Sequence, residues 1–116
     1  MVEYRIKYGE HFLYCITLKL EKYSSGSFEC LLLRDFYSSG FGYYILENIK
    51  TPSELDEFMS WCDKIDMLDC KWYSNKWYSK IDETEAQKKY NEYKDNVKTT
   101  LLNFCEKFNF DFEVLE

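Results

Sequence analysis

Residues 51–65, TPSELDEFMSWCDKI, decide the fold, because the hydrophobic pattern of the chain changes its period here. Thr51, Pro52 and Glu54 form a capping box with proline at the first helical position, which is a strong signal for the start of a helix. Apolar side chains then recur every three or four residues, at Leu55, Phe58, Met59, Cys62 and Ile65. This spacing predicts a helix over residues 51–68 that packs its apolar stripe on a sheet.

Residues 1–49, before this helix, largely alternate apolar and polar side chains, as strands do. The alternation predicts an antiparallel meander of four strands joined by short turns, at residues 2–8, 12–20, 28–36 and 43–49. The run Leu31-Leu32-Leu33 favours burial on both faces, and hence a central place for the third strand. The tetrapeptide Tyr-Ser-Ser-Gly occurs at 23–26 and again at 37–40, and we interpret both copies as hairpin turns.

A second helix is predicted over residues 82–108, where Asp82 can cap and Glu85 follows three residues later. Its apolar stripe runs through Ala86, Tyr90, Tyr93, Val97, Leu101, Phe104 and Phe108. We interpret this stripe as a core face rather than a coiled-coil seam, because its tyrosines suit a sheet better. Residues 109–115 alternate with period two, which favours a short strand at the sheet edge. The fold prediction is a single α+β domain over 1–116, with a four- or five-stranded antiparallel sheet and two helices on one face.

The chain is acidic, and its acidity is uneven. The 116 residues carry a net charge of −6, all of it in residues 51–116. Between residues 54 and 69, six acidic side chains stand against Lys64 alone. Such a segment repels nucleic acid and attracts a basic protein, although a solvated helix face kept acidic for solubility is the plainer alternative.

Location and source follow from the same composition. The chain has no apolar run near the roughly 18 residues of a membrane span, and its first ten residues lack the apolar core of a secretory signal. We therefore expect a cytoplasmic protein. Thirteen lysines against two arginines are typical of AT-rich genes, such as those of a low-GC bacterium or its phage, in which case the compartment is the host cytoplasm.

Catalytic and metal-binding patterns are missing from the sequence. The five cysteines include no C-x-x-C pair, and His11 is the only histidine. We expect most of the cysteines to be reduced and to act as small core side chains. No phosphate loop, zinc signature or nucleophile elbow occurs, so we expect no enzyme, no cofactor and no metal.

The most unusual feature is the connector at residues 70–80, where K-W-Y-S occurs twice. Its candidate binding residues are Lys71, Trp72, Tyr73, Lys76, Trp77 and Tyr78. Three interpretations remain open. The aromatic rings fold back over the core, or they anchor a protein partner, or they stack on unpaired bases while the lysines meet phosphates.

In size, acidity and absence of catalytic motifs the chain resembles small inhibitor proteins, among them phage anti-CRISPR and anti-restriction proteins and bacterial toxin-immunity proteins. This resemblance implies a non-enzymatic inhibitor that mimics phosphates and docks on the basic surface of a nucleic-acid-handling protein, without binding nucleic acid or membrane itself. The acidic candidates for that role are Asp56, Asp63, Asp66, Glu83, Glu85 and Glu92. The alternatives are a module that forms homodimers or larger homo-oligomers, and a single-stranded nucleic-acid binder.

Overall fold

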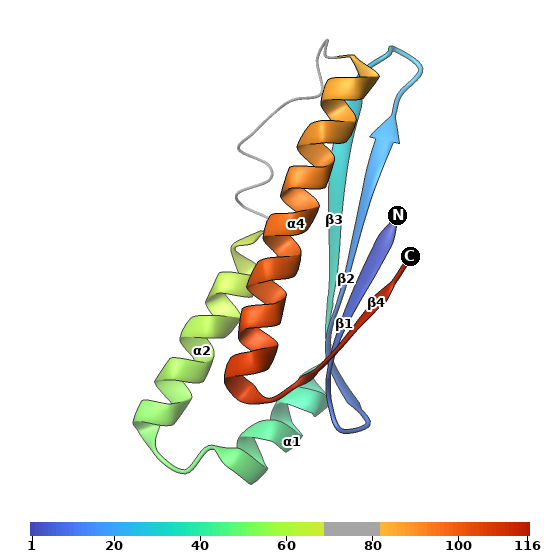
Figure 1. Cartoon of the computed structure of the whole chain (residues 1–116). Helices are drawn as coiled ribbons and strands as arrows, with labels where there is room; N and C mark the ends of the chain where they lie inside the picture. Colours follow the sequence, from blue (N-terminus) through green and yellow to red (C-terminus); the bar gives the residue numbers. More distant parts are fainter. Residues whose placement is uncertain (69–81) are drawn as a thin grey trace.

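The computed structural model describes residues 1–68 and 82–116. Its strands form one antiparallel sheet in the order β3-β2-β1-β4, and helices cover one side of it (Figure 1). The elements in chain order are β1 Val2–Tyr8, β2 His11–Lys22, β3 Phe28–Phe36, α1 Ser38–Asn48, α2 Pro52–Asp66, α4 Glu83–Phe108 and β4 Asp111–Leu115. The predicted α+β class with a four-stranded antiparallel sheet is confirmed.

The hairpin of β1 and β2 forms the middle of the sheet. Gly9 makes the tight turn with a φ of 59°, a left-handed conformation that glycine adopts without strain. The register shifts near the turn, because Ile6 faces Tyr14 whereas Lys7 faces Phe12. Leu13 is the extra residue of this bulge, and both Leu13 and Tyr14 are buried.

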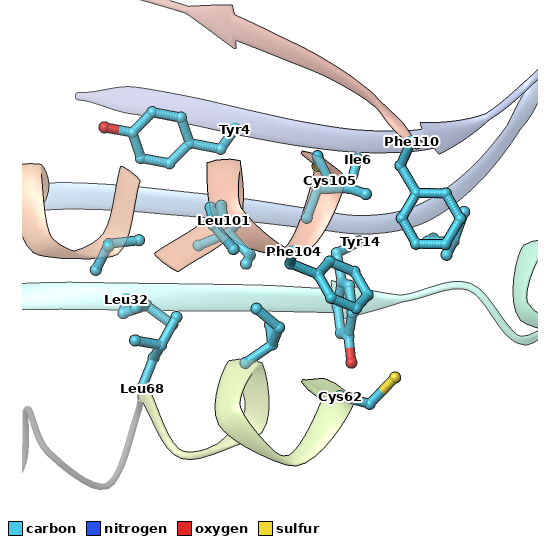
Figure 2. Packing of buried hydrophobic residues seen from close by; sticks show 14 of the residues in the cluster. Tyr4, Ile6, Tyr14, Leu32, Cys62, Leu68, Leu101, Phe104, Cys105 and Phe110 are labelled. Atoms are coloured by element: carbon cyan, nitrogen blue, oxygen red, sulfur yellow. The ribbon is translucent and has the colours of Figure 1, made fainter. Parts of the chain in front are cut away.

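Helix α4 packs on one face of the sheet, roughly along the strands, and supplies much of the core (Figure 2). The Asp82 side chain accepts a hydrogen bond of 2.8 Å from the Glu85 amide, as the capping pattern predicts. The predicted stripe faces inward, with Ala86, Tyr90, Val97, Leu101 and Phe104 buried and Tyr93 and Phe108 packed against the cluster. The interpretation of this stripe as a core face is therefore confirmed.

Helix α2 begins as predicted but is rotated relative to the predicted stripe. The Thr51 hydroxyl accepts a bond of 3.2 Å from the Glu54 amide, and the cap is therefore formed. Phe58, Cys62 and Ile65 are buried, but Leu55 and Met59 are 36% and 46% exposed, and their assignment to the core was wrong. Trp61 explains the rotation, because its ring packs on Phe104 and Phe108 of α4 and turns that side of α2 inward.

The predicted strand at 43–49 is wrong, because these residues belong to helix α1. The second Tyr-Ser-Ser-Gly copy is likewise not a turn: Ser38 begins the helix, whereas the first copy is a turn with Gly26 at a φ of 88°. The residues that follow each copy explain why one is a turn and the other begins a helix. Phe41 and Tyr44, three residues apart, both reach the core from one face of α1.

The central place predicted for the third strand is also wrong, because β3 lies at one edge of the sheet. Leu32 is buried, but Leu33 points to the face that no described helix covers and is 56% exposed. The predicted C-terminal strand does form, as β4, and it pairs with β1 at the other edge. It replaces the strand lost to α1, and so the sheet still has four strands.

Candidate functional site: the acidic ridge of α2

Asp56 and Asp63 form an acidic ridge on the side of α2 that faces solvent. They are seven residues apart, which is two helical turns or about 10.5 Å along the axis, and so they project in nearly the same direction. Both are exposed, and neither makes an ion pair with any residue in the described parts of the chain. We call this pair the acidic ridge.

The other charges of α2 are turned away from the ridge. Lys64, the only cation of the helix, holds its ammonium 4.0 Å from the centre of the Trp61 ring, on the side toward α4. Glu57 is bound there to Lys107 at 2.8 Å. With five acidic side chains against one lysine, α2 carries a charge of −4. Among residues 1–68 and 82–116, therefore, no cation forms an ion pair with the ridge.

Asp66 is acidic but belongs to the framework of the fold. Its carboxylate lies 3.8 Å from Nε of Arg34 and accepts a hydrogen bond of 3.4 Å from the Tyr14 hydroxyl. Arg34 also donates to the main-chain oxygen of Asp66 at 3.2 Å. These bonds join the end of α2 to β2 and β3, so a substitution at Asp66 disturbs packing as well as charge.

The predicted acidic residues of α4 do not extend the ridge. Glu85 and Glu92 lie two turns apart on one side of the helix, with Lys89 between them at helical spacing from both, an arrangement that offsets part of their charge. Glu83 projects from another side and lines a notch beside the sheet. Five acidic residues and five lysines leave α4 with no net charge. The structure therefore concentrates the predicted acidic surface on α2.

Sequence reasoning missed the apolar side chains that flank the ridge. Leu55 and Met59 are exposed on the side of α2 that Asp66 turns toward β3. Phe36, at the end of β3, is 57% exposed and stacks on Phe41 of α1 with 4.4 Å between ring centres. The helical period alone assigned Leu55 and Met59 to the core. Because Trp61 packs on α4 instead, the helix is rotated and these two side chains are exposed.

The aromatic candidates Lys71, Trp72, Tyr73, Lys76, Trp77 and Tyr78 lie outside the described residues. The three interpretations of the K-W-Y-S repeat therefore stay predictions.

The described thiols suit a core and not a nucleophilic site. Cys15, Cys30, Cys62 and Cys105 are all buried. Burial raises the pKa of Cys30, Cys62 and Cys105 to about 12, so these thiols stay protonated at neutral pH, where a nucleophile needs a thiolate. In residues 1–68 and 82–116 no group of three or more His, Cys, Asp or Glu side chains is placed to hold a metal ion.

No family model, no curated protein and no solved structure matches this chain. Within the part of the chain that the structure describes, no helix has both the length and the apolar character needed to cross a membrane.

Proposed function

We propose that this protein is a non-enzymatic inhibitor that binds a basic protein, and that α2 is its contact surface. The acidic ridge is the observation that carries the proposal, because Asp56 and Asp63 are exposed, lie two helical turns apart on one side of α2 and form no ion pair with a described residue. In this role the two carboxylates take the place of phosphates on a surface that normally holds nucleic acid. The protein acts in the cytoplasm, which is the host cytoplasm if the gene is carried by a phage.

The exposed apolar side chains beside the ridge supply binding affinity that charge alone does not. Charge complementarity speeds association and selects the partner, but exposed ion pairs contribute little to affinity. Leu55 and Met59 offer apolar area that a partner can cover, on the same helix as the carboxylates that orient it. The surface therefore fits a basic partner with an apolar depression, and it disfavours a polyanion such as a nucleic acid.

The test begins with the bound partner. The full chain is immobilised, proteins of the native host are captured at low salt, and a captured basic protein is purified for binding measurements. Reversing both ridge charges, Asp56→Lys with Asp63→Lys, is expected to weaken its binding at least about 100-fold, since each reversal replaces attraction by repulsion. The affinity of the wild-type chain is expected to fall as salt is raised.

The matched control reverses two acidic residues of α4, Glu85→Lys with Glu92→Lys, which makes the same change in net charge. We expect this variant to retain most of the affinity, because its sites lie off the ridge. Equal losses in the two variants would show that net charge acts without a defined site. An unchanged affinity of the ridge variant would refute the proposal, as would a captured partner that still binds its nucleic acid when saturated with the inhibitor.

A further inference from the structure

The exposed side of α2 carries apolar side chains as well as the acidic ridge, and the two kinds lie in separate stripes. Leu55 and Met59 are one turn apart, and both are exposed. Met67, directly after the helix, is exposed as well. At 100° per residue, Asp56 and Asp63 lie about 70° further around the helix axis than Leu55 and Met59. The surface therefore consists of an apolar stripe with an acidic stripe beside it.

These residues occupy the positions by which helices recognise one another. In a heptad with Met59 at position a, Leu55 is the preceding d residue, and Asp56 and Asp63 are both e residues. Side chains at a and d of one helix pack between those of its partner, and charged side chains at e and g select the partner. Cys62, the next d residue, is buried in the core of this protein. The apolar stripe is therefore short, and charge must contribute to the choice of partner.

The spacing of the ridge distinguishes a helical partner from an extended one. Asp56 and Asp63 are separated by about 10.5 Å along the helix axis. Two cations seven residues apart on another helix have the same separation and lie on one side of it. In a strand, side chains on one face recur about every 6.7 Å, so that two cations are about 6.7 or 13 Å apart. A helix therefore meets both carboxylates at once, whereas a strand in register with one misses the other.

The charge of α2 decides which helix can bind. The helix carries a charge of −4, and in the described parts of the chain Asp56 and Asp63 make no ion pair. A basic helix is attracted to this surface, whereas an acidic one, including a second copy of α2, is repelled. The exposed methionines suit such a partner, because their unbranched side chains adapt to the apolar faces of different helices.

We propose that the acidic ridge and the apolar stripe beside it bind a basic amphipathic α-helix of the partner protein. This inference rests on the proposed function and adds to it the kind of element that the partner presents. The helix lies along α2 with its apolar side chains on Leu55 and Met59, and lysine or arginine side chains seven residues apart pair with Asp56 and Asp63. Basic helices are a common element by which proteins enter the major groove of DNA, so covering one would block nucleic-acid binding.

Synthetic peptides test the preference for a helix. The probe is a capped peptide of about three heptads with leucine at a and d and lysine at e and g, used at concentrations at which it is monomeric. One control has the same composition in an order without helical period, and another carries two prolines in its middle, which break the helix. Calorimetry with the full chain measures binding, and circular dichroism measures the gain of helix.

We expect the patterned peptide to become helical on binding and to bind at least about tenfold more tightly than either control. Equal binding of the peptide without helical period would overturn the proposal, because net charge alone would then explain binding. Equal binding of the proline peptide would also overturn it, because the surface would then accept an extended chain.

Variants of the full chain locate the site. Met59→Gln removes an apolar contact from an exposed helical position at little cost in helix propensity, and Asp63→Asn removes one charge of the ridge. Each is expected to weaken binding of the patterned peptide about threefold or more. The matched controls, Leu102→Gln and Glu92→Gln, make the same changes at exposed positions of α4 and should bind normally. Equal losses in the controls would overturn the proposal.

The captured partner separates this inference from the proposed function. Its amide hydrogen exchange is measured alone and in complex with the full chain, and we expect the strongest protection in one helix that carries lysine or arginine side chains. Protection of a strand or loop instead, with binding still lost in the ridge variant, would overturn this inference and leave the proposed function standing. Unchanged affinity of the ridge variant for the captured partner would refute the proposed function, and with it this inference.

Discussion

Gly40 brings the first turn of α1 against the backbone of β2. A Cβ at this position would overlap the carbonyl oxygen of Phe12 and stand 2.9 Å from its carbonyl carbon. Only glycine allows this approach, which lets Phe41 and Tyr44 of the same helix reach the core. Gly42, two residues later in α1, has no atom near the place of its missing Cβ. Close packing therefore requires glycine at position 40 but not at position 42, and alanine substitution at each position distinguishes the two cases.

We predict opposite effects of alanine at these two positions. Gly40→Ala is expected to lower the free energy of unfolding by about 1–3 kcal/mol, the usual cost of overpacking, because β2 or α1 must move. Gly42→Ala is expected to raise it by about 0.5–1 kcal/mol, the difference in helix propensity. Urea unfolding followed by circular dichroism measures both. A Gly40→Ala variant as stable as wild type would mean that α1 does not contact Phe12.

At the scale of elements, the end of α2 is joined to the sheet by the bonds of Asp66. We predict that Asp66→Ala lowers the free energy of unfolding by about 0.5–1 kcal/mol, since the bonds to Tyr14 and Arg34 are long and partly solvated. Asp63→Ala, one turn away, is expected to change it by less than about 0.5 kcal/mol. Thermal and urea unfolding of the two variants test this difference.

A double-mutant cycle with Arg34→Ala isolates the side-chain pair, because the Arg34 bond to the main-chain oxygen of Asp66 survives the loss of the carboxylate. A coupling energy near zero would mean that the side-chain pair adds no stability and that the bond from Tyr14 alone holds the Asp66 carboxylate.

The elements that sequence analysis predicted correctly are those in which local signals agree. Both long helices begin at a capping residue and continue with a helical apolar period, and the structure confirms the caps at Thr51 and Asp82. Residues 43–49 gave a wrong prediction because tyrosine, isoleucine and leucine suit strands and helices alike over so short a run. The close approach at Gly40 is a tertiary contact, and no local pattern reports it.

The same reasoning explains what could be predicted of the candidate site. The acidic side chains of α2 were predicted to be exposed, because the capping box fixes where the helix begins and hence which residues share a face. The separation of Glu83 from Glu85 and Glu92 follows from their helical spacing. Which of them faces solvent depends on which side of α4 meets the sheet, and that does not follow from one segment of sequence taken alone.

At the scale of the whole molecule, buried thiols and a buried tyrosine in the core keep their protons at alkaline pH, whereas the same groups lose them in the unfolded chain. Burial raises the pKa of Cys30, Cys62 and Cys105 from 9.0 to about 12, and burial together with neighbouring charges raises that of Tyr4 from 10.0 to about 12. Between these values the folded state binds more protons than the unfolded state. The stability that these groups contribute is therefore full below about pH 9 and is lost as the pH rises toward 12.

We predict that the free energy of unfolding at pH 10 is lower than at pH 8 by on the order of 1 kcal/mol for each of the three thiols. Urea unfolding in buffers of constant ionic strength measures the decline. Removing two thiols, Cys30→Ala with Cys105→Ala, costs stability at pH 8 because it leaves small cavities, but it should make the decline between pH 8 and pH 10 clearly shallower. Parallel declines in wild type and variant would contradict the assignment and would place the titrating groups elsewhere in the fold. A shallower decline in the variant would show that core thiols, rather than the acidic surface of α2, set the alkaline limit of the folded state.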